Sequence, residues 1–114
     1  MEFVVIINPA SGPGNGSINP DFAREITRLN EQKNVKCIGY VRTTWATRNI
    51  TQVYADISQY ASWGGNSTDY QIDGIFFDEA PNNYTIESVE YMSNIDAYVR
   101  NDKGLGNSSF VWSF

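Results

Sequence analysis

Short apolar runs recur along the chain, and each is about as long as a buried strand. The segments between them place apolar residues at every third or fourth position, which is typical of amphipathic helices. The apolar runs cover residues 3–7, 35–41, 72–77 and 110–112. The pattern therefore predicts strands that alternate with helices, beginning and ending on a strand.

Residues that favour helix starts precede each helical segment. Asn19 is a preferred N-cap, and Pro20 follows it at the first helical position. Asn49 and Thr85 occupy the equivalent cap positions of the second and third segments. The helical spacing is carried by Phe22, Ile26 and Leu29, then by Val53, Ile57 and Tyr60, and finally by Met92, Ile95 and Val99.

Strict alternation of strands and helices indicates an α/β fold with parallel strands and right-handed crossovers. Three βα units and a fourth strand make half of a (β/α)₈ barrel, which usually needs about 250 residues, whereas a small open α/β sheet is the other architecture. We expect residues 1–114 to be the N-terminal half of a barrel, in the strand order 1-2-3-4 with helices on one face. The other face should expose Val4, Ile6, Gly74 and Phe76, and self-association through it would follow.

Composition and charge narrow the possible functions. The chain carries 8 Lys and Arg against 13 Asp and Glu, a net charge of −5, which argues against nucleic acid and anionic membranes as partners. No apolar run is long enough for a membrane span or a signal peptide. The chain has no His and a single Cys, Cys37, so Ser-His-Asp catalysis and an internal disulfide are excluded. We expect neither a cofactor nor a metal site, and any acid–base chemistry must use other side chains.

Two carboxylates, Asp78 and Glu79, follow directly after the third apolar run. Sites in parallel α/β folds form at the carboxyl ends of strands, so these residues are the strongest candidates for chemistry. Neighbouring strand residues point to opposite faces, so Glu79 should point away from Asp78 unless the chain has already turned. One alternative is a glycosidase carboxylate with a partner from another strand. The other is a structural carboxylate that caps a helix or pairs with an Arg.

The loops after the first two runs give weaker signals. Residues 8–16 are rich in glycine but lack the Lys of a phosphate-binding loop, so we interpret them as a wide turn. Tyr40 and Trp45 could stack on sugar rings or could simply pack.

Three charged residues near these runs have structural or functional interpretations. Arg42 and Arg48 could clamp a carboxylate, although a solvent-exposed Arg48 is the simpler expectation. Asp73 has the opposite parity to Asp78, so we expect it to pair with a helix residue behind the sheet.

Five Asn-x-Ser/Thr sequons occur, more than the composition predicts. They fit a secreted glycoprotein, or simply an Asn- and Ser-rich chain. Their asparagines are Asn15, Asn49, Asn66, Asn83 and Asn107.

Taken together, the motifs over residues 3–80 resemble the spherulation-specific family 4, or spherulin-4, proteins of fungi and slime moulds. The motifs are Ile6–Pro9, Ser11–Gly14, Gly39–Val41 with Thr43, Arg48, Asp56–Ile57 and Gly74–Glu79. The resemblance implies a (β/α)₈ glycoside hydrolase that cuts α-1,4-linked, galactosamine-containing polysaccharide of the fungal cell wall and biofilm matrix. It also implies an extracellular or cell-surface location.

The resemblance also implies roles for individual residues. Asp78 and Glu79 match the acidic pair of the active site, with Asp78 as nucleophile or charge stabiliser. We expect Asn8, Tyr40, Thr43 and Trp45 to bind the polysaccharide, with Trp45 at the rim. The family draws a further catalytic carboxylate from a later strand, so we expect residues 1–114 to be inactive alone. The alternative is a truncated, non-catalytic relative with at most weak carbohydrate binding.

Overall fold

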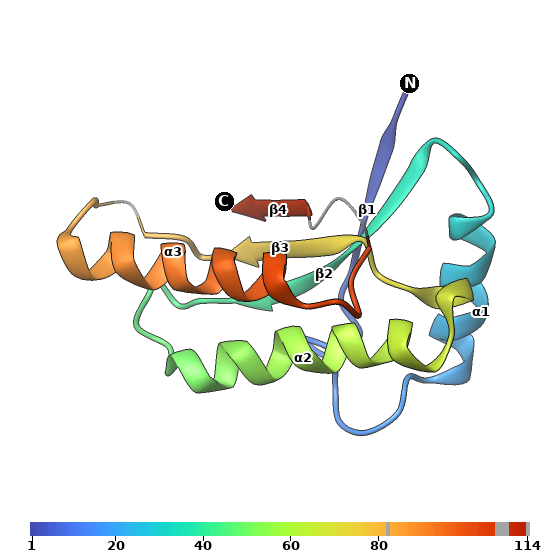
Figure 1. The fold of residues 1–114 in the computed structure, drawn as a ribbon, viewed down its shortest axis with the longest axis horizontal. Helices are drawn as coiled ribbons and strands as arrows, with labels where there is room; N and C mark the ends of the chain where they lie inside the picture. Colours follow the sequence, from blue (N-terminus) through green and yellow to red (C-terminus); the bar gives the residue numbers. More distant parts are fainter. Residues whose placement is uncertain (82, 107–109, 114) are drawn as a thin grey trace.

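A computed structural model describes residues 1–81 and 83–106, together with the backbone of residues 110–113. The described residues form a four-stranded parallel sheet in the order β1-β2-β3-β4 (Figure 1). The elements are β1 (Phe3–Ile7), α1 (Pro20–Asn30), β2 (Val35–Arg42), α2 (Ile50–Asn66), the 3₁₀ turn η1 (Thr68–Tyr70), β3 (Gly74–Asp78), α3 (Ile86–Asn101) and β4 (Phe110–Ser113). The predicted α/β class, strand order and parallel pairing are confirmed.

The predicted caps start the helices. Asn19 Oδ1 accepts the amide hydrogen of Asp21 at 2.8 Å, and Asn49 Oδ1 accepts that of Thr51 at 3.0 Å. At the start of α3, Thr85 forms a reciprocal capping box with Ser88. Each cap satisfies an amide that has no partner inside the first helical turn, which fixes where the helix begins.

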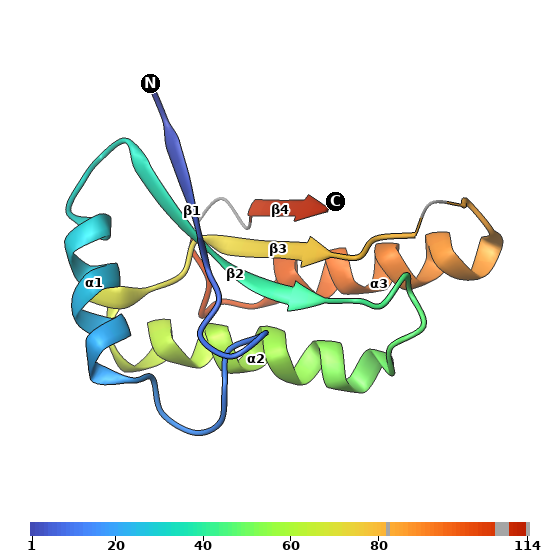
Figure 2. The same cartoon turned by 180° about the vertical axis from the view of Figure 1, so that it is seen from behind.

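The helices cover one face of the sheet, as expected (Figures 1 and 2). The strand residues that pack against them are of one parity, and the most buried are Ile7, Cys37, Val41, Ile75 and Phe77. The helices contribute buried side chains that include Ile26, Val53, Ile57, Tyr60, Trp63, Ile95 and Val99. Alternation along the strands places the remaining strand side chains on the opposite, open face.

The open face is less exposed than the sequence suggested. Ile6 on the edge strand β1 is 45% exposed, but its neighbour Ile38 is fully buried and Phe76 is only 8% exposed. Gly74 is buried as well, so the expected exposure of Gly74 and Phe76 is wrong. Among the side chains that the structure describes, the exposed apolar one on this face therefore lies on β1, while Ile38 and Phe76 on the inner strands are buried.

The strand β3 begins at Gly74, two residues later than the apolar run predicts. Asp73 explains the difference, because its Oδ2 accepts the amide hydrogen of Cys37 on β2 at 3.2 Å. A side-chain oxygen thus takes an amide that a continuing ladder would give to a main-chain carbonyl. The predicted pairing of Asp73 with a helix residue is wrong, since its partner is the backbone of β2.

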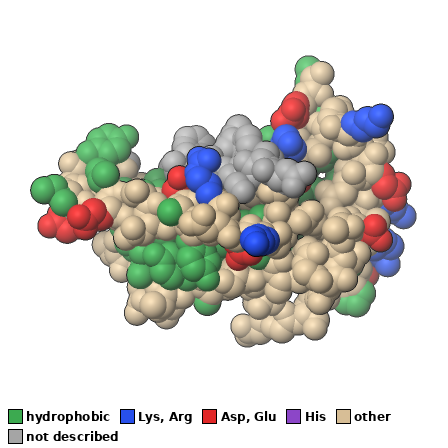
Figure 3. Space-filling model, in the orientation of Figure 1, with side chains coloured by type: hydrophobic (Ala, Val, Ile, Leu, Met, Phe, Trp, Pro, Cys, Tyr) green, Lys and Arg blue, Asp and Glu red, His purple; other side chains and the backbone are tan. Residues whose placement is uncertain are grey.

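Two further features concern the surface. Figure 3 shows hydrophobic side chains at the end of the molecule where α3 begins, and Tyr84, Ile86 and Val89 there are 90%, 77% and 50% exposed. Among the described residues, no helix has the length and apolar character that a membrane span requires.

Candidate active site

The carboxyl ends of β1, β2 and β3 meet at one edge of the sheet, where the loops to the helices begin. The register pairs Tyr40 with Phe76 and Arg42 with Asp78. Because side chains alternate along a strand, Tyr40 and Asp78 share the open face, away from the helices. Asp78 therefore lies on the open face at the carboxyl end of β3.

Asp78 is held by two hydrogen-bond donors. The hydroxyl of Tyr40 donates to Asp78 Oδ2 at 2.7 Å, and the backbone amide of Glu79 donates to Asp78 Oδ1 at 2.8 Å. The hydrogen bond between Tyr40 and Asp78, with smaller contributions from burial and from nearby carboxylate charge, raises the pKa of Tyr40 to about 12. Tyr40 is therefore a neutral donor at ordinary pH, and the direction of the carboxylate is fixed on both sides.

Glu79 differs from Asp78 in both backbone and contacts. Its φ is +57°, in the left-handed region, so the chain turns sharply as β3 ends. The alternation rule stops at this turn, and the expectation that Glu79 must point opposite to Asp78 loses its basis. Among the described residues, no hydrogen bond or ion pair engages the Glu79 carboxylate.

The loop after β2 lies against this turn. Thr43 is fully buried, and its backbone amide donates to the carbonyl oxygen of Asp78 at 3.0 Å. The amide of Trp45 donates to the carbonyl oxygen of Glu79 at 2.6 Å, while the Trp45 side chain is 53% exposed. The two loops are thus joined by main-chain bonds, and the Trp45 ring is exposed to solvent.

Left-handed backbone is concentrated at this edge. Among the described residues, the non-glycine positions with positive φ are Ser11, Thr44, Trp45, Ala46 and Glu79, all in loops that follow a strand. Such conformations cost free energy and persist only where surrounding contacts hold them, and they cluster at functional sites. The left-handed positions therefore gather in the loops that carry the candidate site residues.

Asn8, at the end of β1, is exposed and has a local partner. Its Oδ1 accepts the amide hydrogen of Gly12 at 2.9 Å, which closes the turn after β1. Gly12 has a φ of +147°, so the interpretation of residues 8–16 as a wide turn is confirmed. The structure places Asn8 at the same edge as the acidic pair, but no hydrogen bond among the described residues joins it to Tyr40, Asp78 or Glu79.

Arg48 is not solvent-exposed, contrary to expectation. Its guanidinium donates to Asp56 Oδ2 on α2 at 2.8 Å and to the carbonyl oxygen of Arg42 at 3.0 Å. The side chains of Arg48 and Asp56 are only 15% and 20% exposed. The pair ties the loop after β2 to α2. Arg42 itself is exposed and makes no ion pair with Asp78 among the described residues.

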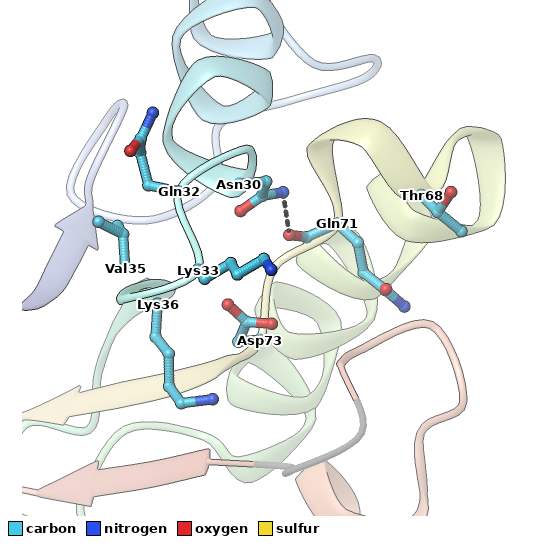
Figure 4. Close-up of a pocket in the computed structure, with 8 residues that line it drawn as sticks. All are labelled: Asn30, Gln32, Lys33, Val35, Lys36, Thr68, Gln71 and Asp73. Carbon is cyan, nitrogen blue, oxygen red and sulfur yellow. Dashed lines mark hydrogen bonds between the residues drawn. The ribbon is translucent and has the colours of Figure 1, made fainter. Parts of the chain in front are cut away.

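A polar hollow lies at the opposite edge of the sheet (Figure 4). It has a volume of about 270 Å³ and is lined by Asn30, Gln32, Lys33, Val35, Lys36, Thr68, Gln71 and Asp73. Burial, the largest effect, raises the pKa of Asp73. Because the amino ends of parallel strands support stability rather than chemistry, this hollow is not the candidate site.

Sequence analysis selected the acidic pair but missed two contacts of the loop after β2. The buried position of Thr43 and its bonds to the turn at Glu79 have no local sequence signal, and neither has the Arg48–Asp56 pair across the fold. Within the described residues, no cluster of three or more His, Cys, Asp or Glu side chains could hold a metal ion.

Comparisons with known proteins give consistent results. The family model described as spherulation-specific family 4 matches residues 1–113. Spherulin-4 from Physarum polycephalum is 30% identical over 109 residues, which are 95% of this chain and 30% of that protein. The crystal structure of Aspergillus clavatus Sph3 in complex with GalNAc superposes with a TM-score of 0.94 and 39% identity, over 98% of this chain and 46% of that one. The chain thus spans less than half of each of these relatives.

Proposed function

Because the chain belongs to the spherulation-specific family 4, we propose that its acidic pair, Asp78 and Glu79, forms part of the active site of a (β/α)₈ glycoside hydrolase. The substrate class is α-1,4-linked, galactosamine-containing polysaccharide of a cell wall or biofilm matrix. One observation carries the proposal: Asp78 is fixed by two donors at the carboxyl edge of the sheet, beside a Glu79 whose carboxylate is unengaged. The GalNAc in the similar Sph3 structure supports an amino sugar as the ligand.

The two carboxylates suit different roles. Asp78, held rigidly, would act as the nucleophile or as the stabiliser of positive charge at the anomeric carbon. Glu79, with no fixed partner, would contact a sugar hydroxyl or exchange a proton. The exposed ring of Trp45 would stack on a sugar at the rim, with its face against the apolar side of the pyranose.

Hydrolysis also needs a general acid for the leaving oxygen. The family's further carboxylate comes from a later strand, beyond residues 1–114. General acid catalysis is typically worth about 10² to 10⁴ in rate, so we expect these residues alone to be close to inactive. A non-catalytic role with weak sugar binding is the second candidate, favoured by the Glu79 carboxylate, which no hydrogen bond or ion pair engages among the described residues.

Titration with GalNAc, followed by amide NMR, tests the location of the site. We expect shifts at Tyr40, Trp45 and Glu79, and none at Asn30 or Gln71, which line the hollow at the opposite edge. Shifts confined to the opposite edge, or no shifts at millimolar sugar, would contradict both candidate functions.

Release of reducing ends from a galactosamine-rich polysaccharide tests the expected inactivity of residues 1–114. We expect the rate for residues 1–114 to stay near background and to be unchanged in Asp78→Asn. Hydrolysis that disappears in Asp78→Asn would show that a complete acid–base pair lies within these residues. The expectation that residues 1–114 are inactive by themselves would then be wrong, while the assignment of the site to Asp78 would stand.

We also place the protein outside the cell or at its surface, as the family suggests. The sequon asparagines within the described residues, Asn15, Asn49, Asn66 and Asn83, are all exposed, and Asn107 lies outside those residues. Expression through a eukaryotic secretory pathway should give a mass that falls on treatment with an N-glycosidase. An unchanged mass would contradict the glycoprotein assignment.

A further inference from the structure

Thr43 is a buried polar residue at the centre of the loop contacts. It is 0% exposed, although Arg42 and Thr44 beside it both reach the surface. A buried hydroxyl costs free energy unless it is hydrogen-bonded. Thr43 Oγ1 lies 2.9 Å from the carbonyl oxygen of Glu79 and 3.2 Å from that of Asp78. The hydroxyl therefore donates its hydrogen to the backbone of the acidic pair and not to a ligand.

Glu79 is the residue that needs this support. Its left-handed φ of +57° is unfavourable for a side chain with a Cβ. Its backbone groups are all engaged, because the amide donates to Asp78 and the carbonyl accepts from Thr43 Oγ1 and from the Trp45 amide. Of these contacts, the Thr43 hydroxyl is the one that a substitution can remove without changing a carboxylate or the main chain.

We propose that Thr43 is a positioning residue that holds Glu79 in its left-handed conformation and so sets the direction of the Glu79 carboxylate relative to Asp78. This inference deepens the proposed function and rests on it for the sugar-binding readout alone. It replaces the expectation that Thr43 contacts the sugar itself. The backbone of Glu79 provides a second readout that needs no ligand.

Two substitutions separate the hydroxyl from the packing of this side chain. Thr43→Val keeps the shape and removes the hydrogen bond, whereas Thr43→Ser keeps the hydroxyl and removes a methyl group. The ¹³C shifts and amide coupling of Glu79 report whether its backbone stays left-handed. We expect Thr43→Val to move these signals away from left-handed values and Thr43→Ser to leave them unchanged.

GalNAc titration provides the functional readout. A hydrogen bond typically contributes an amount equivalent to roughly three- to tenfold in an equilibrium constant. We expect Thr43→Val to weaken GalNAc binding by about that factor, and Thr43→Ser to bind GalNAc as tightly as the unmodified chain does. Thr47→Val is the matched control, because Thr47 lies exposed in the same loop and its hydroxyl bonds the carbonyl of Thr44. It should leave the Glu79 signals unchanged.

Each outcome bears on the inference separately from the proposed function. Unchanged Glu79 signals in Thr43→Val, or equal changes in Thr47→Val, would overturn the positioning role. Should Thr43→Val fail to fold, Thr43→Ser still decides, since a Glu79 that moves on loss of a methyl group would indicate packing instead. Absence of GalNAc binding by the unmodified chain would contradict the proposed function and leave the backbone readout intact.

Discussion

The hydroxyl of Tyr40 links the ionisation of two side chains at the candidate site. It donates to Asp78 at 2.7 Å, and this hydrogen bond is the largest cause of its raised pKa. A raised pKa means that the folded state favours the neutral phenol. The corresponding stability is present below pH 10, the ordinary pKa, and is lost as the pH rises through about 12.

Replacement of the acceptor should reverse this effect. In Asp78→Asn the negative charge is gone, so we expect the pKa of Tyr40 to fall from about 12 back toward 10. Tyrosine ¹³C NMR across alkaline pH follows each ring separately. Asp96→Asn is the control, because Asp96 pairs with Arg100 on α3 and should leave Tyr40 unchanged. A Tyr40 that titrates near 10 in the unmodified chain would contradict the hydrogen bond.

Cys37 allows a second test at this scale. It is fully buried in β2, and burial, followed by the charge of Asp73, raises its pKa to about 11. The thiolate is the reactive form, so a shift of this size slows reaction with a thiol reagent by about a hundredfold before access is considered. We expect negligible labelling near neutral pH and rapid labelling in denaturant. Rapid labelling of the folded chain would show that β2 opens readily.

The strands β1 and β2 are joined at their carboxyl ends by a helix residue. The Tyr60 hydroxyl of α2 lies 3.1 Å from the carbonyl oxygen of Ile7 and 2.9 Å from that of Tyr40. Its ring lies directly over Gly39, where a Cβ would come within 2.7 Å of the ring carbons. Glycine at this position therefore lets the helix approach the sheet and reach both strands.

Gly39→Ala should destabilise the fold. The Tyr60 ring is fully buried and hydrogen-bonded at its far end, so it has little room to move. We expect a loss of about 1–3 kcal/mol in the free energy of unfolding, as in other overpacked cores. Gly65→Ala is the matched control, since nothing lies within 4 Å of its Cβ position in α2. It should gain about 0.5–1 kcal/mol. Equal urea midpoints for the two variants would contradict this account.

Elements with local signals were predictable from sequence, and contacts between elements were not. The caps at Asn19, Asn49 and Thr85 are properties of a few neighbouring residues, and the structure confirms them. The left-handed conformation at residue 79 could not be predicted, because the residue there is a glutamate and not a glycine. Hydrogen bonds from the loop after β2 hold Glu79 in this conformation. The partner of Arg48 is Asp56 on α2, a contact between elements that no local pattern indicates. The alternation of side chains along β3 could not show that Asp73 accepts a hydrogen bond from the backbone of β2.

The two outer strands of the sheet, β1 and β4, each have one side without a partner strand among the described residues. β1 pairs with β2 alone, and β4 pairs with β3 alone. Unpaired strand edges are templates for association with another chain. A twofold axis parallel to the strands would place β4 of one copy beside β1 of the other, in parallel. Two copies would then supply eight strands, the number that closes a small barrel with a filled interior.

Self-association through this arrangement is our prediction for the isolated chain. Among the described side chains of the open sheet face, the exposed apolar one is Ile6 of β1, which is 45% exposed and would be covered on closure. We expect light scattering to give a mass above 12.8 kDa that rises with concentration. Ile6→Lys should shift the chain toward monomer, because a charge would enter the new core.

Ile86→Lys separates this interface from general stickiness. Ile86 is 77% exposed at the start of α3, which packs against the other face of the sheet, so its replacement should leave the mass unchanged. Thermal unfolding of both variants checks that each remains folded. Equal loss of association in both would indicate non-specific aggregation of exposed apolar residues. A monomer at all concentrations would show that the covered Ile38 and Phe76 already satisfy the open face, and that four strands are stable without a second copy.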